Sequence, residues 1–143
     1  MECVTTVSFS ILVNGGKSKH FKPTRGLRQG DPLSPYLFII CQEILSKMIE
    51  KEFLNDGLHG VQMNLAGPTF THVMYADDIM LFAKANSSEV KMLDKCLNKY
   101  CSWSGQCINR DKSGIIFSKH VPHEKRREIK QLLQMKKVQP NAK

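Results

Sequence analysis

The sequence lacks the features that would place it in a membrane or in several large enzyme classes. In its 143 residues, no apolar run approaches the roughly 20 residues needed to cross a bilayer. No signal-peptide pattern opens the chain, and it contains no P-loop or dinucleotide-binding fingerprint. Its five histidines show no spacing of a nucleophile and its base. These absences favour a soluble intracellular protein.

Cysteine is too sparse and too irregularly spaced to predict a disulfide framework or a zinc site. The five cysteines would leave one unpaired in any disulfide scheme. Most lie in apolar periodic segments, where a free thiol behaves as a small hydrophobe. No CxxC pair occurs, and Cys96 and Cys101 are five positions apart on an expected helix. We interpret the cysteines as core or surface thiols of a reducing compartment, not as metal ligands.

Positive charge, by contrast, is abundant and unevenly distributed. Of the formal net charge of +8, residues 110–143 contribute +7, from ten lysines and arginines against three acids. A second basic stretch contains no acid and comprises Lys17, Lys19, Lys22, Arg25 and Arg28. Such asymmetry suits a partner with a phosphate backbone, and a solvated surface explains it equally well.

Hydrophobic periodicity predicts a single α+β domain with an antiparallel sheet and helices packed on one face. In the N-terminal half we expect a hairpin that begins with Thr6–Asn14, turns at Asn14-Gly15 and returns near Lys19–Lys22. A long helix then begins with Ser34 as its N-cap and Pro35 in its first turn, and ends near Gly57.

The C-terminal half is expected to alternate strands and helices. The expected elements are strands at Val61–Leu65, Phe70–Tyr75 and Ile79–Ala83, a helix capped by Asn86 with Glu89 and ended by Gly105, a strand pair Cys107–Asn109 and Ile115–Phe117 around Lys112, and a basic helix from about His123 to Met135.

Two adjacent acids interrupt an apolar run where core would be expected. Asp77 and Asp78 stand between Val73-Met74-Tyr75 and Ile79-Met80-Leu81-Phe82. Adjacent carboxylates repel each other and lose hydration when buried, so the simplest geometry is a tight hairpin with both at its tip. A divalent cation would remove the repulsion, and Mg²⁺ favours one or two carboxylates with water and phosphate ligands. The alternative is an exposed turn that merely favours aspartate.

Three motifs in this order resemble those of reverse transcriptases. Tyr75-Ala76-Asp77-Asp78 is similar to the YxDD box and reads YADD. The preceding stretch RGLRQGDPLSPYLF resembles the motif that contacts template and nucleotide, and the later SWSGQCINRDKS resembles the motif after the hairpin. The likeness covers nearly the whole chain and is closest to the non-LTR, LINE-like retrotransposon type familiar in plant genomes. An RNA-directed RNA polymerase would usually carry a GDD box. Tyr75-Ala76 before the two aspartates therefore argues against that class.

The resemblance implies part of the palm domain of an RNA-directed DNA polymerase, a nucleotidyltransferase with two Mg²⁺ ions. Asp77 would be the main metal ligand and Asp78 a second acid. Lys112 would donate a proton to the pyrophosphate or stabilise its charge, unless it is an ordinary surface lysine. The expected nucleotide- and template-binding residues are Arg25, Gln29, Gly30 and Tyr75, although core packing would explain Tyr75 about as well. The implied partners are an RNA template, a DNA primer and a deoxynucleoside triphosphate.

The sequence departs from the family pattern at its N-terminal side. Family enzymes carry an earlier strand with a metal-binding Asp, whereas Glu2 is the only acid in the first thirty residues and its setting does not match. We therefore expect an N-terminally truncated fragment, inactive on its own, with a partial palm at residues 1–118. Residues 119–143 would form a basic helix and tail that begin the palm–thumb connection. The alternative is a non-catalytic remnant that binds nucleic acid. Lys125-Arg126-Arg127 only suggests a nuclear location.

Overall fold

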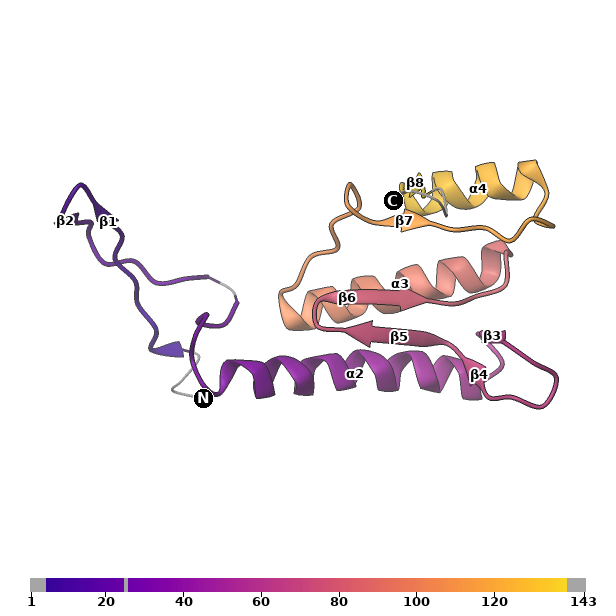
Figure 1. The fold of residues 1–143 in the computed structure, drawn as a ribbon, viewed down its shortest axis with the longest axis horizontal. Coiled ribbons are helices and arrows are strands. Elements are labelled where there is room, and N and C mark those ends of the chain that lie inside the picture. Colours follow the sequence, from indigo (N-terminus) through magenta and orange to yellow (C-terminus); the bar gives the residue numbers. More distant parts are fainter. Residues whose placement is uncertain (1–4, 25, 139–143) are drawn as a thin grey trace.

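Helices and short strands alternate along residues 5–24 and 26–138, the part of the chain that the computed structural model describes. The three long helices are α2 (Ser34–Leu54), α3 (Ser87–Ser104) and α4 (His123–Leu133). In Figure 1, α2 runs along one side of the β5–β6 hairpin, α3 lies beside the same hairpin, and α4 follows beyond α3. The α+β class is therefore confirmed. No helix of these residues is long and apolar enough to cross a membrane.

The described strands form four two-stranded ladders. Three are antiparallel: β1 (Leu12–Val13) with β2 (Gly16–Lys17), β3 (Val61–Gln62) with β4 (Thr69–Phe70), and β5 (His72–Tyr75) with β6 (Asp78–Leu81). The fourth ladder, β7 (Gly114–Ile115) with β8 (Lys136–Lys137), is parallel.

The first hairpin turns where the sequence predicts it. Asn14 and Gly15 have φ angles of 50° and 81°, and two consecutive positive φ angles are what a tight two-residue hairpin of the type I′ family requires. A further antiparallel bridge joins Phe9 to Phe21, whose ring centroids are 6.0 Å apart. Every residue from Ile11 to Thr24 is nevertheless exposed, so this hairpin stands outside the core.

Helix α2 begins differently from the prediction. Its N-cap is Leu33, not Ser34, and the leucine side chain makes no capping hydrogen bond to the first turn. The reason is Asp31, whose Oδ1 accepts a hydrogen bond from the Leu33 N–H at 2.8 Å. This bond turns the chain into the helix one residue before the predicted N-cap. The Ser34 hydroxyl is then free to donate to the carbonyl oxygen of Arg28, at 2.7 Å. Pro35 lies in the first turn as predicted.

Helix α3 confirms its predicted caps. The Asn86 side chain accepts a hydrogen bond from the Glu89 N–H at 2.8 Å. At the other end, Gly105 adopts a left-handed conformation with φ of 71°. Because both signals act within a few residues, the sequence alone is sufficient to define this helix.

The predicted strand pair Cys107–Asn109 with Ile115–Phe117 is wrong. Cys107–Asn109 lies in no strand, and β7 pairs instead with β8 beyond helix α4. The physical reason is Arg110, whose guanidinium binds Asp94 of α3 at 2.8 Å and the carbonyl oxygen of Leu133 in α4. This anchoring brings the end of α4, and β8 after it, beside β7.

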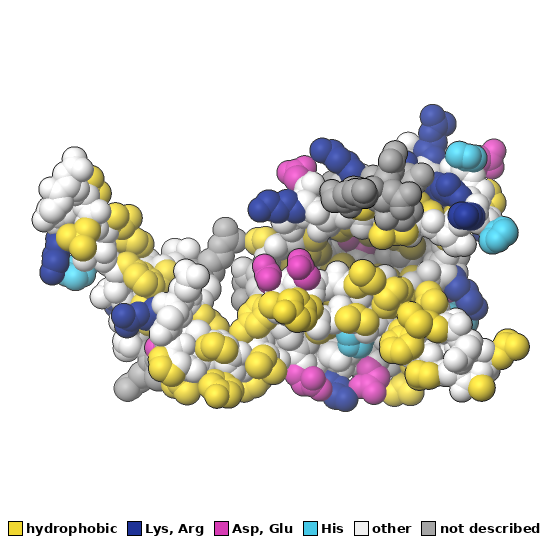
Figure 2. All heavy atoms as spheres, in the orientation of Figure 1, with side chains coloured by type: hydrophobic (Ala, Val, Ile, Leu, Met, Phe, Trp, Pro, Cys, Tyr) yellow, Lys and Arg dark blue, Asp and Glu magenta, His cyan; other side chains and the backbone are white. Residues whose placement is uncertain are grey.

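The core is small for a chain of this length. Its fully buried large side chains are Leu45 and Ile49 of α2 and Leu58, and Leu93 and Tyr100 of α3 complete the central cluster. The accessible surface is 11517 Å², against roughly 7,500 Å² expected for a compact monomer of this mass. Figure 2 shows apolar side chains gathered over α2 and the β5–β6 hairpin. A body with so much uncovered apolar surface is expected to be only marginally stable.

Candidate active site

The β5–β6 hairpin presents the YADD residues at its tip. Tyr75 pairs with Asp78, which leaves Ala76 and Asp77 as the two residues of the turn. Met74, Ile79 and Leu81 face inward and pack against the central cluster. The alternate residues of the two strands are exposed on the opposite face. The sequence therefore predicts this tight hairpin correctly.

Both aspartates are exposed at the turn. Asp77 lies within it and Asp78 opens β6. Among the ion pairs formed by residues 5–24 and 26–138, none includes either carboxylate, so their charges are available to a cation. Tyr75 is 82% exposed, which excludes core packing as the explanation of this residue here. Its ring and the Asp78 carboxylate lie on the same face of the hairpin, because the two residues are directly paired.

The donor set suits one magnesium ion better than two. Mg²⁺ binds through one or two carboxylates together with water and phosphate oxygens. Asp77 and Asp78 can provide the carboxylates. Within the described part of the chain, no group of three or more His, Cys, Asp or Glu side chains could hold a metal ion. A two-metal arrangement would therefore need a further carboxylate from a segment beyond this hairpin.

A buried glutamine of α2 contacts the backbone of the turn. Gln42 of α2 is 8% exposed, and its Nε2 donates to the carbonyl oxygen of Ala76 at 3.5 Å. Its Oε1 is buried without a hydrogen-bond partner among the described residues. Sequence reasoning missed this residue. The available signal was a single amide among the mainly apolar residues that helical spacing places on the inner side of the long helix.

A hollow of about 540 Å³ opens between α2 and β5 beside the turn. Its lining residues are Phe38, Ile39, Gln42, Glu43, Ser46, His72, Met74 and Ala76. Of the lining residues, His72 and Ser46 contact each other, with His72 Nε2 and the Ser46 hydroxyl 2.8 Å apart. The other ring nitrogen, His72 Nδ1, lies 2.9 Å from Thr71 Oγ1. Burial lowers the pKa of His72 despite the opposing effect of Glu50 and Glu43. Burial thus disfavours the charged form of this imidazole, which lies beside the Ser46 hydroxyl.

The loop before α2 carries the predicted nucleotide contacts. Gln29 and Gly30 are exposed, and Gly30 has a φ of 82° with no atom within 4 Å of a would-be Cβ. The glycine thus provides a left-handed turn and an open backbone. The Ser34 hydroxyl ties this loop to the helix through the Arg28 carbonyl. Arg25 lies outside the described residues.

Lys112 stands on a separate exposed turn after α3. Asn109 builds this turn: its Oδ1 accepts from the Lys112 N–H at 3.1 Å, and its carbonyl oxygen accepts from the Ser113 N–H at 2.9 Å. The neighbouring Arg110 anchors the turn to α3. The described site residues therefore occupy three loops. Helix α2 contacts two of them, the Gln29 loop and the YADD turn.

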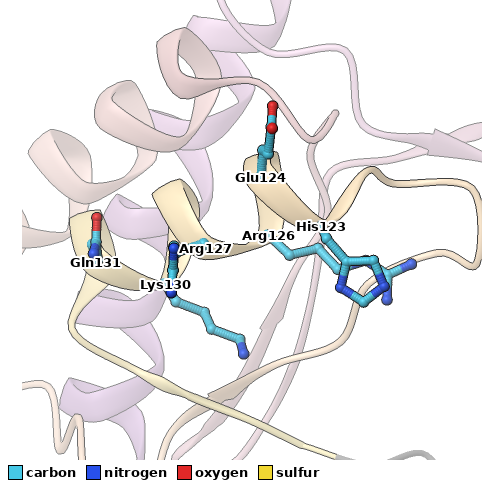
Figure 3. A pocket seen from close by; sticks show the side chains of 6 residues that line it. All are labelled: His123, Glu124, Arg126, Arg127, Lys130 and Gln131. Atoms are coloured by element: carbon cyan, nitrogen blue, oxygen red, sulfur yellow. The ribbon is translucent and has the colours of Figure 1, made fainter.

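A second hollow, of about 590 Å³, lies along the surface of α4. It is lined by His123, Glu124, Arg126, Arg127, Lys130 and Gln131, all of one helix, with Glu124 pointing to the opposite side from Lys130 (Figure 3). The Arg126 side chain is occupied by the preceding loop, because its guanidinium donates to the carbonyl oxygens of Val121, Ser118 and Lys119. Arg127 and Lys125 are exposed and remain available to an anion.

Comparison with known proteins relates residues 1–138 to the family described as reverse transcriptase (RNA-dependent DNA polymerase). A Retrovirus-related Pol polyprotein from the type-2 retrotransposable element R2DM of Drosophila melanogaster is 31% identical over 116 residues, which are 81% of this chain and 10% of that protein. An uncharacterised mitochondrial protein of Arabidopsis thaliana is 43% identical over 67 residues, 47% of this chain and 55% of that protein. The chain thus spans about half of one relative and a tenth of the other. No solved structure matches it.

Proposed function

The chain belongs to the reverse transcriptase family, and from that premise we propose that it carries the metal-binding hairpin and the nucleotide-contacting loop of an RNA-directed DNA polymerase of a retroelement. The observation that supports this most strongly is the setting of Asp77 and Asp78. Both are exposed at the tip of a hairpin whose inner face packs on the core. Burial of the inner face fixes the hairpin while its tip remains open to substrate.

Each site residue has a role that its exposure permits. Asp77 and Asp78 would hold Mg²⁺, which when bound supplies activation of the primer 3′-hydroxyl and neutralisation of the pyrophosphate charge. The Gln29 amide can donate and accept hydrogen bonds toward a base pair, while Gly30 leaves the backbone accessible. The exposed ring of Tyr75 can pack against a nucleotide sugar, and the Lys112 ammonium can donate a proton to the leaving group.

We further propose that residues 1–118 are part of the palm and that residues 119–143, which include α4, begin its connection to the thumb. The partners would be an RNA template, a DNA primer and a deoxynucleoside triphosphate. Two Mg²⁺ ions about 4 Å apart need carboxylates from more than one strand to offset their repulsion. We therefore propose that another strand supplies the further carboxylate, and that this chain alone has no appreciable polymerase activity.

Paramagnetic Mn²⁺, used as a substitute for Mg²⁺ in nuclear magnetic resonance, tests the metal-binding role. We expect Mn²⁺ to broaden the amide signals of residues 76–78 in the wild-type chain and to lose most of this effect in Asp77→Asn. Asp56→Asn is a matched control, because Asp56 is also an exposed acid at a turn but has no acidic neighbour. Equal broadening in Asp77→Asn and the wild type would refute the metal-binding role.

Primer extension on an RNA template tests the inactivity of the isolated chain. With Mg²⁺ and deoxynucleoside triphosphates we expect no extension above that of Asp77→Asn. Extension by the wild-type chain that disappears in Asp77→Asn would show that this chain completes the site without another strand.

A non-catalytic role in nucleic-acid binding is the second candidate, favoured by the exposed cations on α4. Binding through Lys125 and Arg127 would fall steeply as salt rises, because each phosphate contact releases condensed counterions. It would also be insensitive to Asp77→Asn. Titration of a labelled RNA–DNA duplex at several salt concentrations, with Arg127→Gln as the variant, distinguishes this role from the polymerase role.

A further inference from the structure

We infer that Gln42 is a positioning residue for the YADD turn, which it serves by holding the peptide that joins Ala76 to Asp77. This inference rests on the proposed role of Asp77 as a metal ligand. Gln42 lies on α2, 34 positions before the residue that it contacts. Its side chain is directed at the backbone of the turn and not at a carboxylate, so it would act through Asp77 without touching metal or substrate.

Stability alone does not explain a glutamine at this place. The side chain is more than nine-tenths buried, it makes one long hydrogen bond, and its Oε1 is unpaired among the described residues. A buried amide with an unsatisfied oxygen costs free energy that an apolar side chain of the same size would not. The hydrogen bond to the Ala76 carbonyl oxygen is the interaction that an apolar side chain could not make.

The turn needs such a support because its conformation is not one that the local sequence favours. Ala76 has a φ of 49°, in the left-handed region that residues with a side chain other than Asn or Asp seldom adopt. The carbonyl of Ala76 and the amide nitrogen of Asp77 belong to one planar peptide. A donor that fixes this carbonyl therefore fixes the direction in which Asp77 leaves the turn. Asp78 is held separately, by its ladder pairing with Tyr75.

Helix α2 thereby holds both proposed substrate-contacting segments. At its first turn the Ser34 hydroxyl binds the Arg28 carbonyl beside Gln29. Gln42 follows eight positions later, about 12 Å along the helix axis. One rigid element thus sets the distance between the nucleotide-contacting loop and the turn that bears Asp77. The 3.5 Å contact of Gln42 is at the long limit of a hydrogen bond, so we expect it to shorten when a divalent cation orders the turn.

Nuclear magnetic resonance of the whole chain tests the inference in two ways. The variants are Gln42→Met, which keeps the volume and removes the amide, and Gln42→Glu, which keeps the shape and removes the N–H donor. Gln62→Met is the matched control, because Gln62 Nε2 also donates to a turn carbonyl, that of Gly67 at 2.8 Å. In both Gln42 variants we expect the Ala76 carbonyl and Asp77 amide resonances to move, and the Asp77 amide to exchange faster with solvent.

Mn²⁺ affinity and thermal stability complete the test. In Gln42→Met the dissociation constant of Mn²⁺ at the turn should rise by about two- to tenfold, as expected for one lost hydrogen bond. The thermal midpoint should stay level or rise, because the unpaired Oε1 is removed. A merely structural glutamine would instead lower the midpoint and leave the Asp77 resonances in place, which would overturn the inference.

The two proposals fail in distinguishable ways. If Mn²⁺ does not bind the turn of the wild-type chain, the proposed metal-binding function fails. The metal-free resonances of Ala76 and Asp77 then still report whether Gln42 holds the turn. If Gln62→Met weakens Mn²⁺ binding as much as Gln42→Met does, the effect is not specific to the turn and the inference about Gln42 is wrong.

Discussion

The two hairpins β1–β2 and β5–β6 have the same length of turn but are held in different ways. Asn14-Gly15 closes the first hairpin with two residues that readily adopt positive φ. Ala76-Asp77 closes the second, where a single positive φ falls on an alanine. All of Ile11–Thr24 is exposed, whereas the second hairpin packs Met74, Ile79 and Leu81 against the core.

The comparison shows that local chemistry shapes the first hairpin and tertiary packing shapes the second. A turn that its own residues favour needs no support from elsewhere. A turn against local preference persists only where its surroundings determine it, and such turns cluster at functional sites. Here the unfavourable turn is the one that bears Asp77, and both the core and Gln42 support it.

The largest expected difference between the hairpins comes from the core. Leu45→Ala should lower the free energy of unfolding by about 2–5 kcal/mol, because it leaves a cavity at a fully buried position. Hydrogen exchange should accelerate in β5–β6 but not in β1–β2, and denaturant titration gives the change in stability. Leu12→Ala, at a side chain 69% exposed, is the control. Similar losses from both substitutions would contradict the view that only one hairpin depends on the core.

The next effect concerns Glu89, which fastens the chain where it leaves β6. Glu89 is 3% exposed. Its carboxylate accepts hydrogen bonds from the backbone N–H groups of Lys84 and His59 and from the side chains of Asn86 and His59. Burial alone would raise the pKa of this carboxyl, but the hydrogen bonds outweigh it and the pKa lies below the ordinary 4.5.

A carboxyl with a lowered pKa in the folded state stabilises the protein above its ordinary pKa. That stabilisation is lost as pH falls below about 4.5 and then through the lower folded value. Glu89→Gln should therefore cost about 1 kcal/mol at neutral pH and flatten the loss of stability in acid. Urea titrations at pH 7 and at several lower pH values measure this, with Glu43→Gln as an exposed control. An unchanged slope in Glu89→Gln would show that other groups cause the acid sensitivity.

Relief of the unfavourable turn should have a smaller effect, of the opposite sign. Ala76→Gly places glycine where φ is positive and should stabilise the folded chain by about 0.5–1 kcal/mol. If Gln42 holds the turn as we infer, Mn²⁺ affinity should change little, because Gln42 still binds the carbonyl oxygen of residue 76 and so limits the added freedom of glycine. Thermal unfolding and Mn²⁺ titration of the same variant check both expectations. A destabilised variant would mean that the alanine is not strained.

The smallest effect is expected in the first hairpin. Gly15→Ala forces a side chain into a φ of 81° and should lower the population of the β1–β2 ladder. The global free energy of unfolding should change by less than about 0.5 kcal/mol, because this hairpin lies outside the core. Chemical shifts of Leu12 and Lys17 measure the population of the ladder, and denaturant titration measures the global free energy of unfolding. A large global loss would place the hairpin within the cooperative unit.

The sequence predicts those parts of the fold whose signals are local. Asn14-Gly15 and the Asn86 and Gly105 caps each act within a few residues, and the tight YADD hairpin follows from two acids inside an apolar run. Predictions fail where the partner is distant. The pairing of Ile115 with Lys137 and the contact of Gln42 with Ala76 bring together segments that no short pattern connects. Tyr75 is ambiguous in sequence because either face of a strand can hold an aromatic ring, and only packing determines which face is covered.

The parallel pairing of β7 with β8 also imposes an order on folding while the chain is made at the ribosome. The β5–β6 hairpin can close, and α2 and α3 can pack around Leu45 and Tyr100, as soon as Ser104 has emerged. Strand β7 can pair only after Lys137 has emerged, and Arg110, which can already bind Asp94, reaches its second partner only when Leu133 has been made. A premature stop codon between Ser104 and Leu133 would therefore release a chain whose YADD turn has formed but whose helix α4 is incomplete and not anchored to Arg110.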